Sequence, residues 1–270
     1  MTVSSAETVT NKIRPRKEKP RTNQVLVIVG LLVLWQIFAT IGSLGAVPTP
    51  VEVTVAFGSL LAGGTIWSPL GETMLSLALS LVAATIVGVA VGFPLGVSRI
   101  AYRMSALTLD FLRTIPALVL VPLVALLFGA GIESVVVLAF LAAVWAVLMQ
   151  AIYGVHDVDP VARETFRSLR VRKIDYVRLL LLPSAAPYLS TGIRLAAAVC
   201  LLVSISAQIV IPAGGLGEAI LIAQLGGAVP EMYAYIFLCG LLGIAIDAAF
   251  RAMERRALNW HPAHRKTRTK

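Results

Sequence analysis

Residues 73–97 read TMLSLALSLVAATIVGVAVGFPLGV and contain no charged side chain. A helix of about 20 apolar residues crosses the roughly 30 Å hydrocarbon core of a bilayer. An uncharged stretch of this length is much longer than a mean soluble helix of about 12 residues. The segment therefore predicts a membrane-spanning helix.

Further apolar stretches follow the same pattern, and they predict an all-α, polytopic membrane protein with six transmembrane helices. We expect the spans near residues 25–44, 73–97, 114–129, 134–153, 187–211 and 232–250. The first span follows a basic segment, as a signal peptide's apolar region would. Its 20-residue apolar run is longer than that region, and no small-residue cleavage site directly follows it. We therefore expect a retained helix.

The overall composition agrees with this assignment. The chain has 270 residues, of which 58% are hydrophobic and 14% charged, and its mean hydropathy is +0.86. A soluble domain carries about 25% charged residues. These values exclude a water-soluble enzyme of ordinary composition and disorder over most of the chain. The two cysteines, Cys200 and Cys239, lie in apolar stretches and indicate no disulfide framework.

The lysines and arginines predict the orientation of the spans. Of 23 such residues, six precede the first span, three lie between spans two and three, six lie between four and five, and seven follow the sixth. Because cytoplasmic loops carry the excess of Lys and Arg, we expect both termini in the cytoplasm. The net charge of +9 then reflects topology and attraction to the lipid bilayer, and we expect no nucleic-acid partner.

The longest cytoplasmic connection, residues 155–186, has a helical pattern of its own. Asp159-Pro160 is a typical helix start, and residues 161–170 (VARETFRSLR) have a rough apolar side. After a break at 171–173, a second helical pattern runs to Leu182-Pro183. Two short helices joined by a turn form either a knob for a partner's groove or an amphipathic segment along the headgroups.

This loop resembles that of the permease (transmembrane) subunits of bacterial ABC importers, in the nitrate/sulfonate/taurine branch. That family has Glu-Ala-Ala, a Gly four residues after the second Ala, and a later Leu-Pro. The matching stretch here is Glu164-Thr165-Phe166-Arg167-Ser168-Leu169-Arg170, then Leu182-Pro183 and Gly192-Ile193-Arg194. The two alanines are replaced by Thr165 and Phe166, and the glycine by Arg170.

Other segments extend the resemblance over roughly residues 45–260. They are Pro48-Thr-Pro-Val-Glu-Val, Arg113-Thr-Ile-Pro-Ala-Leu, Val121-Pro-Leu-Val-Ala-Leu-Leu-Phe-Gly129, Gly215-Leu216-Gly217, and Gly243 with Asp247. The resemblance implies a six-span permease domain at 25–250, flanked by basic cytoplasmic tails at 1–24 and 251–270. It also implies a multi-pass protein of the bacterial inner (cytoplasmic) membrane.

The resemblance further implies that the loop docks on a cytosolic ATPase and couples ATP-driven closure to movement of the spans. The coupling residues would be Glu164, Thr165, Phe166, Arg167, Leu169, Arg170, Leu182 and Pro183. Since the chain has no G-x-x-x-x-G-K-[ST] motif, we expect it not to be an enzyme. We expect no cofactor in this chain, with ATP and Mg²⁺ in the partner ATPase.

The expected partners are two ATPase subunits, a second permease (identical or a paralogue) and an external solute-binding protein. Family analogy favours a small solute such as a sulfonate, taurine or nitrate. Two alternatives from other classes are open: an ATP-independent channel or secondary carrier, and a membrane anchor that recruits a cytosolic protein.

Arg170 stands where the family has a glycine, which adopts positive φ at little cost. Either the turn uses a negative φ here, or Arg170 reaches a carboxylate of the partner.

Glycines and prolines indicate how the spans pack and bend. Gly88, Gly92 and Gly96 recur every four residues and predict a face for close helix packing. Pro94 among them predicts a kink. Pro116 and Pro122 either bend the third span around a solute pathway or end helices at the interface.

Polar residues in the later spans are candidates for the solute pathway. Ser204 and Gln208, at positions i and i+4, either line the route or form an interhelical hydrogen bond. In related permeases the position of Gln208 is often Glu. Pro116 is the third pathway candidate.

Charged residues near the last span suggest an ion pair. Asp247 and Arg251 are at i, i+4 and are expected to pair. Alternatively, Arg194 reaches Asp247. The segment 214–217 (GGLG) is either re-entrant, with amides facing a solute or binding protein, or an ordinary turn. No residues have metal-site spacing.

Overall fold

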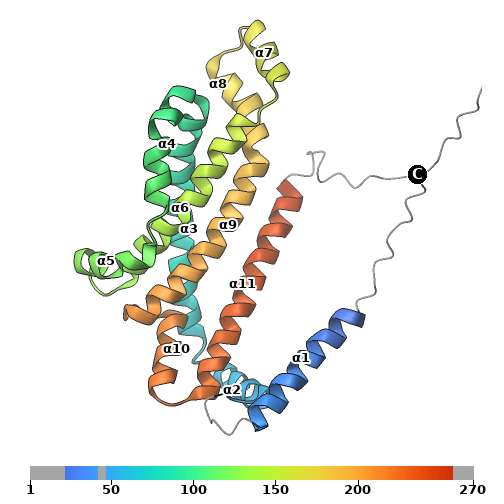
Figure 1. Ribbon diagram of the computed structural model, residues 1–270, viewed down its shortest axis with the longest axis vertical. Coiled ribbons are helices and arrows are strands. Elements are labelled where there is room, and N and C mark those ends of the chain that lie inside the picture. Colours follow the sequence, from blue (N-terminus) through green and yellow to red (C-terminus); the bar gives the residue numbers. More distant parts are fainter. Residues whose placement is uncertain (1–21, 42–46, 258–270) are drawn as a thin grey trace, which may run out of the picture. The chain divides into compact units, whose positions relative to one another are not determined.

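The computed structural model describes residues 22–41 and 47–257, and within these ranges it is all-helical (Figure 1). In chain order the helices are α1 Thr22–Ile41, α2 Pro50–Ala62, α3 Trp67–Val97, α4 Arg99–Arg113, the 3₁₀ turn η1 Ala117–Leu120, α5 Val121–Phe128, α6 Ile132–His156, α7 Pro160–Ser168, α8 Lys173–Tyr176, the π-helical turn η2 Val177–Leu181, α9 Leu182–Val210, α10 Gly215–Leu225 and α11 Val229–Ala257.

Among the described residues, four helices are long and apolar enough to cross a membrane, or five spans result if one bent pair counts as a span. They are Trp67–Val97, Ile132–His156, Lys173–Val210 and Val229–Arg256. They coincide with the second, fourth, fifth and sixth predicted spans. The first predicted span falls on α1, and its last residues lie outside the described ranges. Most of both predicted tails, residues 1–21 and 258–270, also lie outside the described residues.

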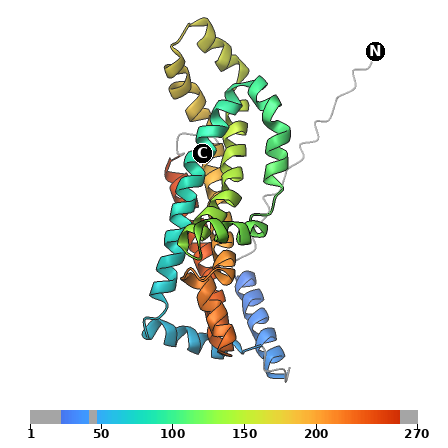
Figure 2. The ribbon, with the colours of Figure 1, turned by 90° about the vertical axis from the view of Figure 1, so that its left-hand side faces the viewer.

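The chain divides into two compact units, residues 1–51 and 52–270. Within the second unit, α3, α6 and α9 pack side by side along most of their length (Figures 1 and 2). Their shared core includes Leu77 of α3, Val147 of α6 and Cys200 of α9, all buried. This three-helix bundle is the frame on which the remaining elements are placed.

Glycines allow α3 to pack closely on α6. Gly88, Gly92 and Gly96 are buried on one side of α3. A Cβ added to Gly88 would lie 2.7 Å from the Cβ of Val147, and one added to Gly92 would lie 2.5 Å from the carbonyl oxygen of Leu148. These distances leave no room for a methyl group, so the predicted packing face is confirmed.

The segment after α3, which we expected to be a cytoplasmic connection between spans two and three, is the helix α4. Ser98 caps it, because its side-chain oxygen accepts a hydrogen bond from the N–H of Ala101 at 3.2 Å. The apolar residues Ile100, Met104 and Leu107 then recur every three to four positions. Because this segment is charged, its amphipathic helical pattern was not recognised in the sequence. The helix α4 turns back beside the bundle (Figure 2).

The predicted third span, 114–129, is not one helix. After α4 the chain bends by 72° and continues as η1 and the short α5. Pro116 lies in the break, and Pro122 lies in the first turn of α5, where its missing N–H needs no partner. Both prolines mark helix boundaries. Pro94 similarly lies in the last turn of α3, which ends at Val97.

Two predicted loops also contain helices. The helix α2 lies in the segment 45–72, and its Phe57 packs edge-on against Phe237 of α11 with ring centroids 5.8 Å apart. The helix α10 lies in the segment 212–231 and packs against α3, α9 and α11. Both helices were too short to be recognised as spans in the sequence.

The second helix of the long loop continues into the membrane-spanning helix, so the predicted end at Leu182-Pro183 is wrong. The N–H of Leu182 donates to the carbonyl of Val177, five residues earlier. Pro183 has no N–H, and its ring crowds the carbonyl four residues before it. The wider π-helical turn accommodates the proline, and one helix of 38 residues runs from Lys173 to Val210.

Candidate functional site

The loop between α6 and α9 begins with a well-capped helix. Asp159 precedes α7, and its carboxylate accepts a hydrogen bond from the N–H of Val161 at 2.9 Å, with Pro160 in the first turn. Arg163 reaches back and donates to the carbonyl of Val155 at 2.9 Å. The start of α7 is therefore fixed both by its own cap and by the end of α6.

The helix α7 ends in a turn with a left-handed residue at position 170. Arg170 has a φ of +50° and is the one non-glycine residue with positive φ in the described part of the chain. The N–H of Arg170 donates to the carbonyl of Arg167, and the N–H of Val171 donates to that of Phe166. This pattern is a Schellman motif, in which glycine is preferred at the left-handed position. The alternative of a negative φ at this turn is therefore wrong.

A small apolar core holds the loop against the bundle. The rings of Phe166 and Tyr176 meet edge to face, with centroids 6.1 Å apart. Beneath them lie the buried side chains of Val155, Val158 and Leu181. The loop is therefore a packed structural element rather than an unanchored connection.

The predicted coupling residues fall in two places. The segment Glu164–Arg170 forms the exposed part of α7 and its cap, and within it Phe166 alone is half-buried. Leu169 is 70% exposed, and so is Val161 in the first turn of the helix. Leu182 and Pro183 lie instead at the start of α9.

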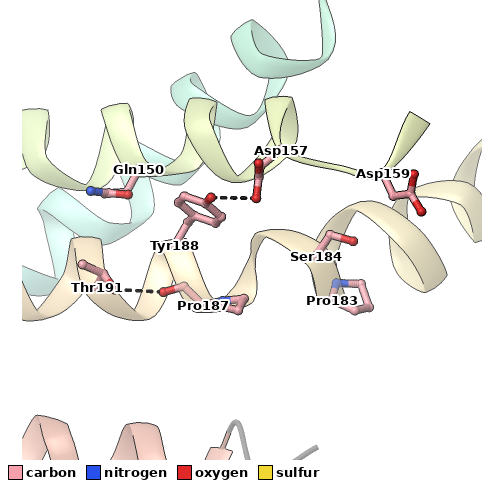
Figure 3. Close-up of a pocket in the computed structure, with 8 residues that line it drawn as sticks. All are labelled: Gln150, Asp157, Asp159, Pro183, Ser184, Pro187, Tyr188 and Thr191. Atoms are coloured by element: carbon pink, nitrogen blue, oxygen red, sulfur yellow. Dashed lines mark hydrogen bonds between the residues drawn. The ribbon is translucent and has the colours of Figure 1, made fainter. Parts of the chain in front are cut away.

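A cavity of about 710 Å³ lies behind this loop, between the end of α6 and the start of α9 (Figure 3). It is lined by Gln150, Asp157, Asp159, Pro183, Ser184, Pro187, Tyr188 and Thr191. The hydroxyl of Tyr188 donates to the carboxylate of Asp157 at 2.7 Å and joins the two helices across it. The lining contains the carboxylates of Asp157 and Asp159, and of its residues Asp159 and Pro183 were singled out from the sequence.

Gln208 and Ser204 are buried inside the bundle, at 1% and 0% exposure. The side-chain oxygen of Gln208 accepts hydrogen bonds from the hydroxyl of Thr73 at 3.0 Å and from the N–H of Gly217 at 3.3 Å. This contact joins α3, α9 and α10, which is the interhelical role that the sequence left as the alternative to lining the pathway. Pro116, the third candidate, is exposed in the break before η1.

The glycine-rich segment before α10 is held by side chains. The amides of residues 214–217 donate, in order, to Glu218, Glu72, Thr73 and Gln208. All four N–H groups are therefore used within the chain, and none faces a solute or a docked protein as the re-entrant alternative required. Side chains of α3, of α9 and of α10 itself thereby cap the N-terminus of α10.

The sequence did not identify Glu72 and Thr73 as residues that stabilise the fold. Glu72 stood out in the sequence only as an isolated charge beside the second span, and its hydrogen-bond partner Gly215 is 143 residues away. Isolated carboxylates at the edge of an apolar run are a signal that such a contact exists. The partner itself could be found only from the packing of α3 against α10.

The ion pairs near the last helix differ partly from expectation. Arg251 and Asp247 are paired, and both are about half exposed. Arg194 of α9 reaches α11 but contacts Glu254 at 3.3 Å rather than Asp247. The described residues contain no group of three or more His, Cys, Asp or Glu side chains placed to hold a metal ion.

Comparison with known proteins identifies the family of this chain. Residues 84–259 match the family described as "Binding-protein-dependent transport system inner membrane component". The chain belongs to this family. The matched region of this permease begins in α3 and includes the loop formed by α7 and α8, the residue Gln208 and the helix α11.

Relatives of this permease are similar to it over nearly their whole length. The taurine transport system permease protein TauC of Escherichia coli (strain K12) is 27% identical over 94% of this chain and 97% of the relative. The putative aliphatic sulfonates transport permease protein SsuC of Bacillus subtilis (strain 168) is 27% identical over 97% and 95%. The nitrate import permease protein NrtB of Synechocystis sp. is 26% identical over 90% and 94%.

Solved structures share the fold of this permease. A chain of the MetNI methionine ABC transporter in an inward facing conformation superposes with a TM-score of 0.58, over 72% of this chain and 97% of that one, at 21% identity. A second crystal form gives a TM-score of 0.56 over 67% and 92%.

Family membership establishes the general activity. This chain is the permease subunit of a binding-protein-dependent ABC importer and a multi-pass inner membrane protein. It is not itself an enzyme, because the ATPase of this family is a separate subunit. This result replaces the alternatives of an ATP-independent channel or carrier and of a membrane anchor.

Proposed function

We propose that this permease moves a small sulfonate-, taurine- or nitrate-like solute that an external binding protein delivers. The support is the group of relatives whose names specify taurine, aliphatic sulfonates and nitrate. In the predicted topology, the outer segments of this chain carry no Lys or Arg to attract an anion. Selection of the solute would therefore belong to the binding protein.

The proposed topology has six spans and both termini in the cytoplasm. The distribution of Lys and Arg supports this orientation. The helix α1 supplies the first span, and the bent pair of α4 with η1 and α5 supplies the third. The loop 155–186 then lies on the cytoplasmic side, with the basic tails.

The proposed assembly contains two permeases and two ATPase subunits. One bundle built on three packed helices is too small to enclose an alternating pathway, which supports pairing with an identical or paralogous permease. Ser204 and Gln208 are buried in this conformation, so they would reach the pathway only if α9 moved relative to α3. ATP and Mg²⁺ would bind in the ATPase subunits.

The single observation that supports the coupling role is the shape of the α7 turn. The loop is anchored by Arg163 and the Phe166–Tyr176 pair, yet it exposes Val161, Glu164 and Leu169. A rigid projection with exposed apolar and charged side chains is suited to transmit movement from a partner that binds it.

Co-purification of the permease with its ATPase tests this role. We expect Glu164→Arg to abolish co-purification and ATP turnover stimulated by the solute-loaded binding protein. Glu231→Arg makes the same charge reversal at the start of α11, far along the chain from the loop, and should leave co-purification unchanged. If Glu164→Arg retained normal docking and turnover, the proposed coupling role would be wrong.

A further inference from the structure

A second cavity lies on the inner side of the α7–α8 loop. Its volume is about 430 Å³, within the range of roughly 300–1,000 Å³ that ligand sites occupy. It is lined by Val97, Arg163, Phe166, Arg167, Arg170, Val171, Lys173 and Tyr176. It therefore lies between the last residue of α3 and the turn that joins α7 to α8.

The charge of this cavity is entirely positive. Its four charged lining residues are Arg163, Arg167, Arg170 and Lys173, and no acidic side chain lines it. In the described part of the chain none of the four forms a salt bridge. Like charges gathered in one cavity repel one another, and an anion placed among them would relieve that repulsion.

Two further observations concern the cations that line this cavity. The Nε of Arg163 is buried and has no hydrogen-bond partner, although a buried N–H normally has one. Arg170 adopts a φ of +50°, which costs a non-glycine residue roughly 1–2 kcal/mol. Backbone strain of this kind is concentrated at functional sites, and here it places a cation on the cavity wall.

The cavity also has an apolar part. Val97, Phe166, Val171 and Tyr176 form its remaining lining. Val97 is the last residue of the long apolar helix α3. In the proposed topology, this residue marks the boundary between the hydrocarbon core and the cytoplasmic headgroups. A ligand with a phosphate and an apolar stem matches both parts of the lining, whereas free phosphate matches only the cations.

The helix α7 is thereby divided into two faces. Three of the lining residues, Arg163, Phe166 and Arg167, follow the i, i+3, i+4 spacing of a single face of α7. Arg170 follows the helix, in its C-terminal cap. Glu164 does not line the cavity, and it is exposed, as are Arg167 and Arg170. One face can therefore bind a ligand while the other is available to the ATPase.

We propose that this cavity binds the phosphate of an anionic phospholipid of the cytoplasmic leaflet. Arg167, Arg170 and Lys173 bind the phosphate, and Phe166 with Val97 contacts the glycerol and upper acyl chain. Basic pockets at the cytoplasmic side of membrane helices are suited to such headgroups. The bound lipid fixes the inner face of α7 and so stabilises the orientation of its outer face. The inference rests on the proposed topology and not on the ATPase partner.

Native mass spectrometry of the full-length chain in detergent tests the proposal, with phosphatidylglycerol and phosphatidylcholine as probes. We expect preferential binding of phosphatidylglycerol. Arg170→Gln combined with Lys173→Gln should weaken it roughly 25-fold, since each cation contributes about fivefold. The matched control, Arg172→Gln with Arg178→Gln, removes two nearby charges that do not line the cavity and should have little effect.

Equal binding of the two lipids would overturn the proposal. So would an equal loss of phosphatidylglycerol binding in the cavity variant and the control variant. Displacement of phosphatidylglycerol by millimolar inorganic phosphate would also overturn it. If the cavity variant fails to fold, hydrogen exchange on the unmodified chain in nanodiscs is decisive. Adding phosphatidylglycerol to phosphatidylcholine should then protect residues 163–176, and unchanged exchange there would contradict the site. Neither measurement involves the ATPase, so failure here is distinguishable from failure of the coupling role.

Discussion

Replacing Gly92 with alanine should separate α3 from α6. The added Cβ would lie 2.5 Å from the carbonyl oxygen of Leu148 and 2.9 Å from the Cβ of Ala151. Neither atom belongs to a flexible side chain that could rotate away. The two helices must therefore move apart at this point of close approach.

The size of the effect follows from two opposing contributions. Overpacking of this kind costs about 1–3 kcal/mol, whereas alanine in place of glycine within a helix gains up to about 1 kcal/mol. Gly71 lies on the same helix, and a Cβ added there meets no atom within 4 Å. Gly71→Ala should show only the gain in stability from helix propensity. The free energies of unfolding of the two variants should therefore differ by the whole overpacking cost.

Thermal unfolding in detergent provides the assay. Cys200 is fully buried in the core shared by the three central helices, so its reaction with a thiol dye reports unfolding once Cys239 is replaced by alanine. For a chain of this size, 1 kcal/mol shifts Tm by roughly 2–4 °C. We expect Gly92→Ala to melt about 2–12 °C below Gly71→Ala. Equal melting temperatures would show that the α3–α6 contact is looser than described.

Two further substitutions test the site. Arg170→Gly should be about 1 kcal/mol more stable than Arg170→Ala, because both remove the charge but only glycine relieves the left-handed backbone; equal Tm values would contradict the strained turn. Gln208→Leu should lower stability by about 1–3 kcal/mol, since it leaves the N–H of Gly217 unpaired, and amide exchange at the start of α10 should rise. Ser204→Ala is the control, because the Ser204 hydroxyl is buried without a partner and its removal should leave Tm nearly unchanged.

The sequence predicted those elements that depend on local composition. Long apolar runs with few charges identified α3, α6, α9 and α11, because spanning a bilayer requires a length of apolar helix that few other structures need. The spacing of Gly88, Gly92 and Gly96 identified the packing face, since close helix approach requires small residues at that interval. The Asp159-Pro160 start of α7 was likewise a local signal.

Features that depend on tertiary contacts were not predictable in this way. The charges of α4 concealed its amphipathic pattern, and α2 and α10 are too short to be recognised from apolar length. The hydrogen bonds of Glu72 and Gln208 join segments far apart in sequence, so no local pattern reveals them. The positive φ of Arg170 is favoured only because the packed loop on both sides of it fixes the turn, against the residue's own preference.

We expect the loop that contains α7 to face the cytoplasm and to be bound by the ATPase. Labelling of introduced cysteines tests both expectations directly. Leu169→Cys and Trp67→Cys introduce thiols at exposed positions, 70% and 61%, in a chain whose two native cysteines are replaced by alanine. A membrane-impermeant maleimide should label Leu169→Cys only in inside-out vesicles and Trp67→Cys only in intact cells. Added ATPase should protect Leu169→Cys alone. Labelling of Leu169→Cys from outside the cell, or the same labelling with and without the ATPase, would contradict the account.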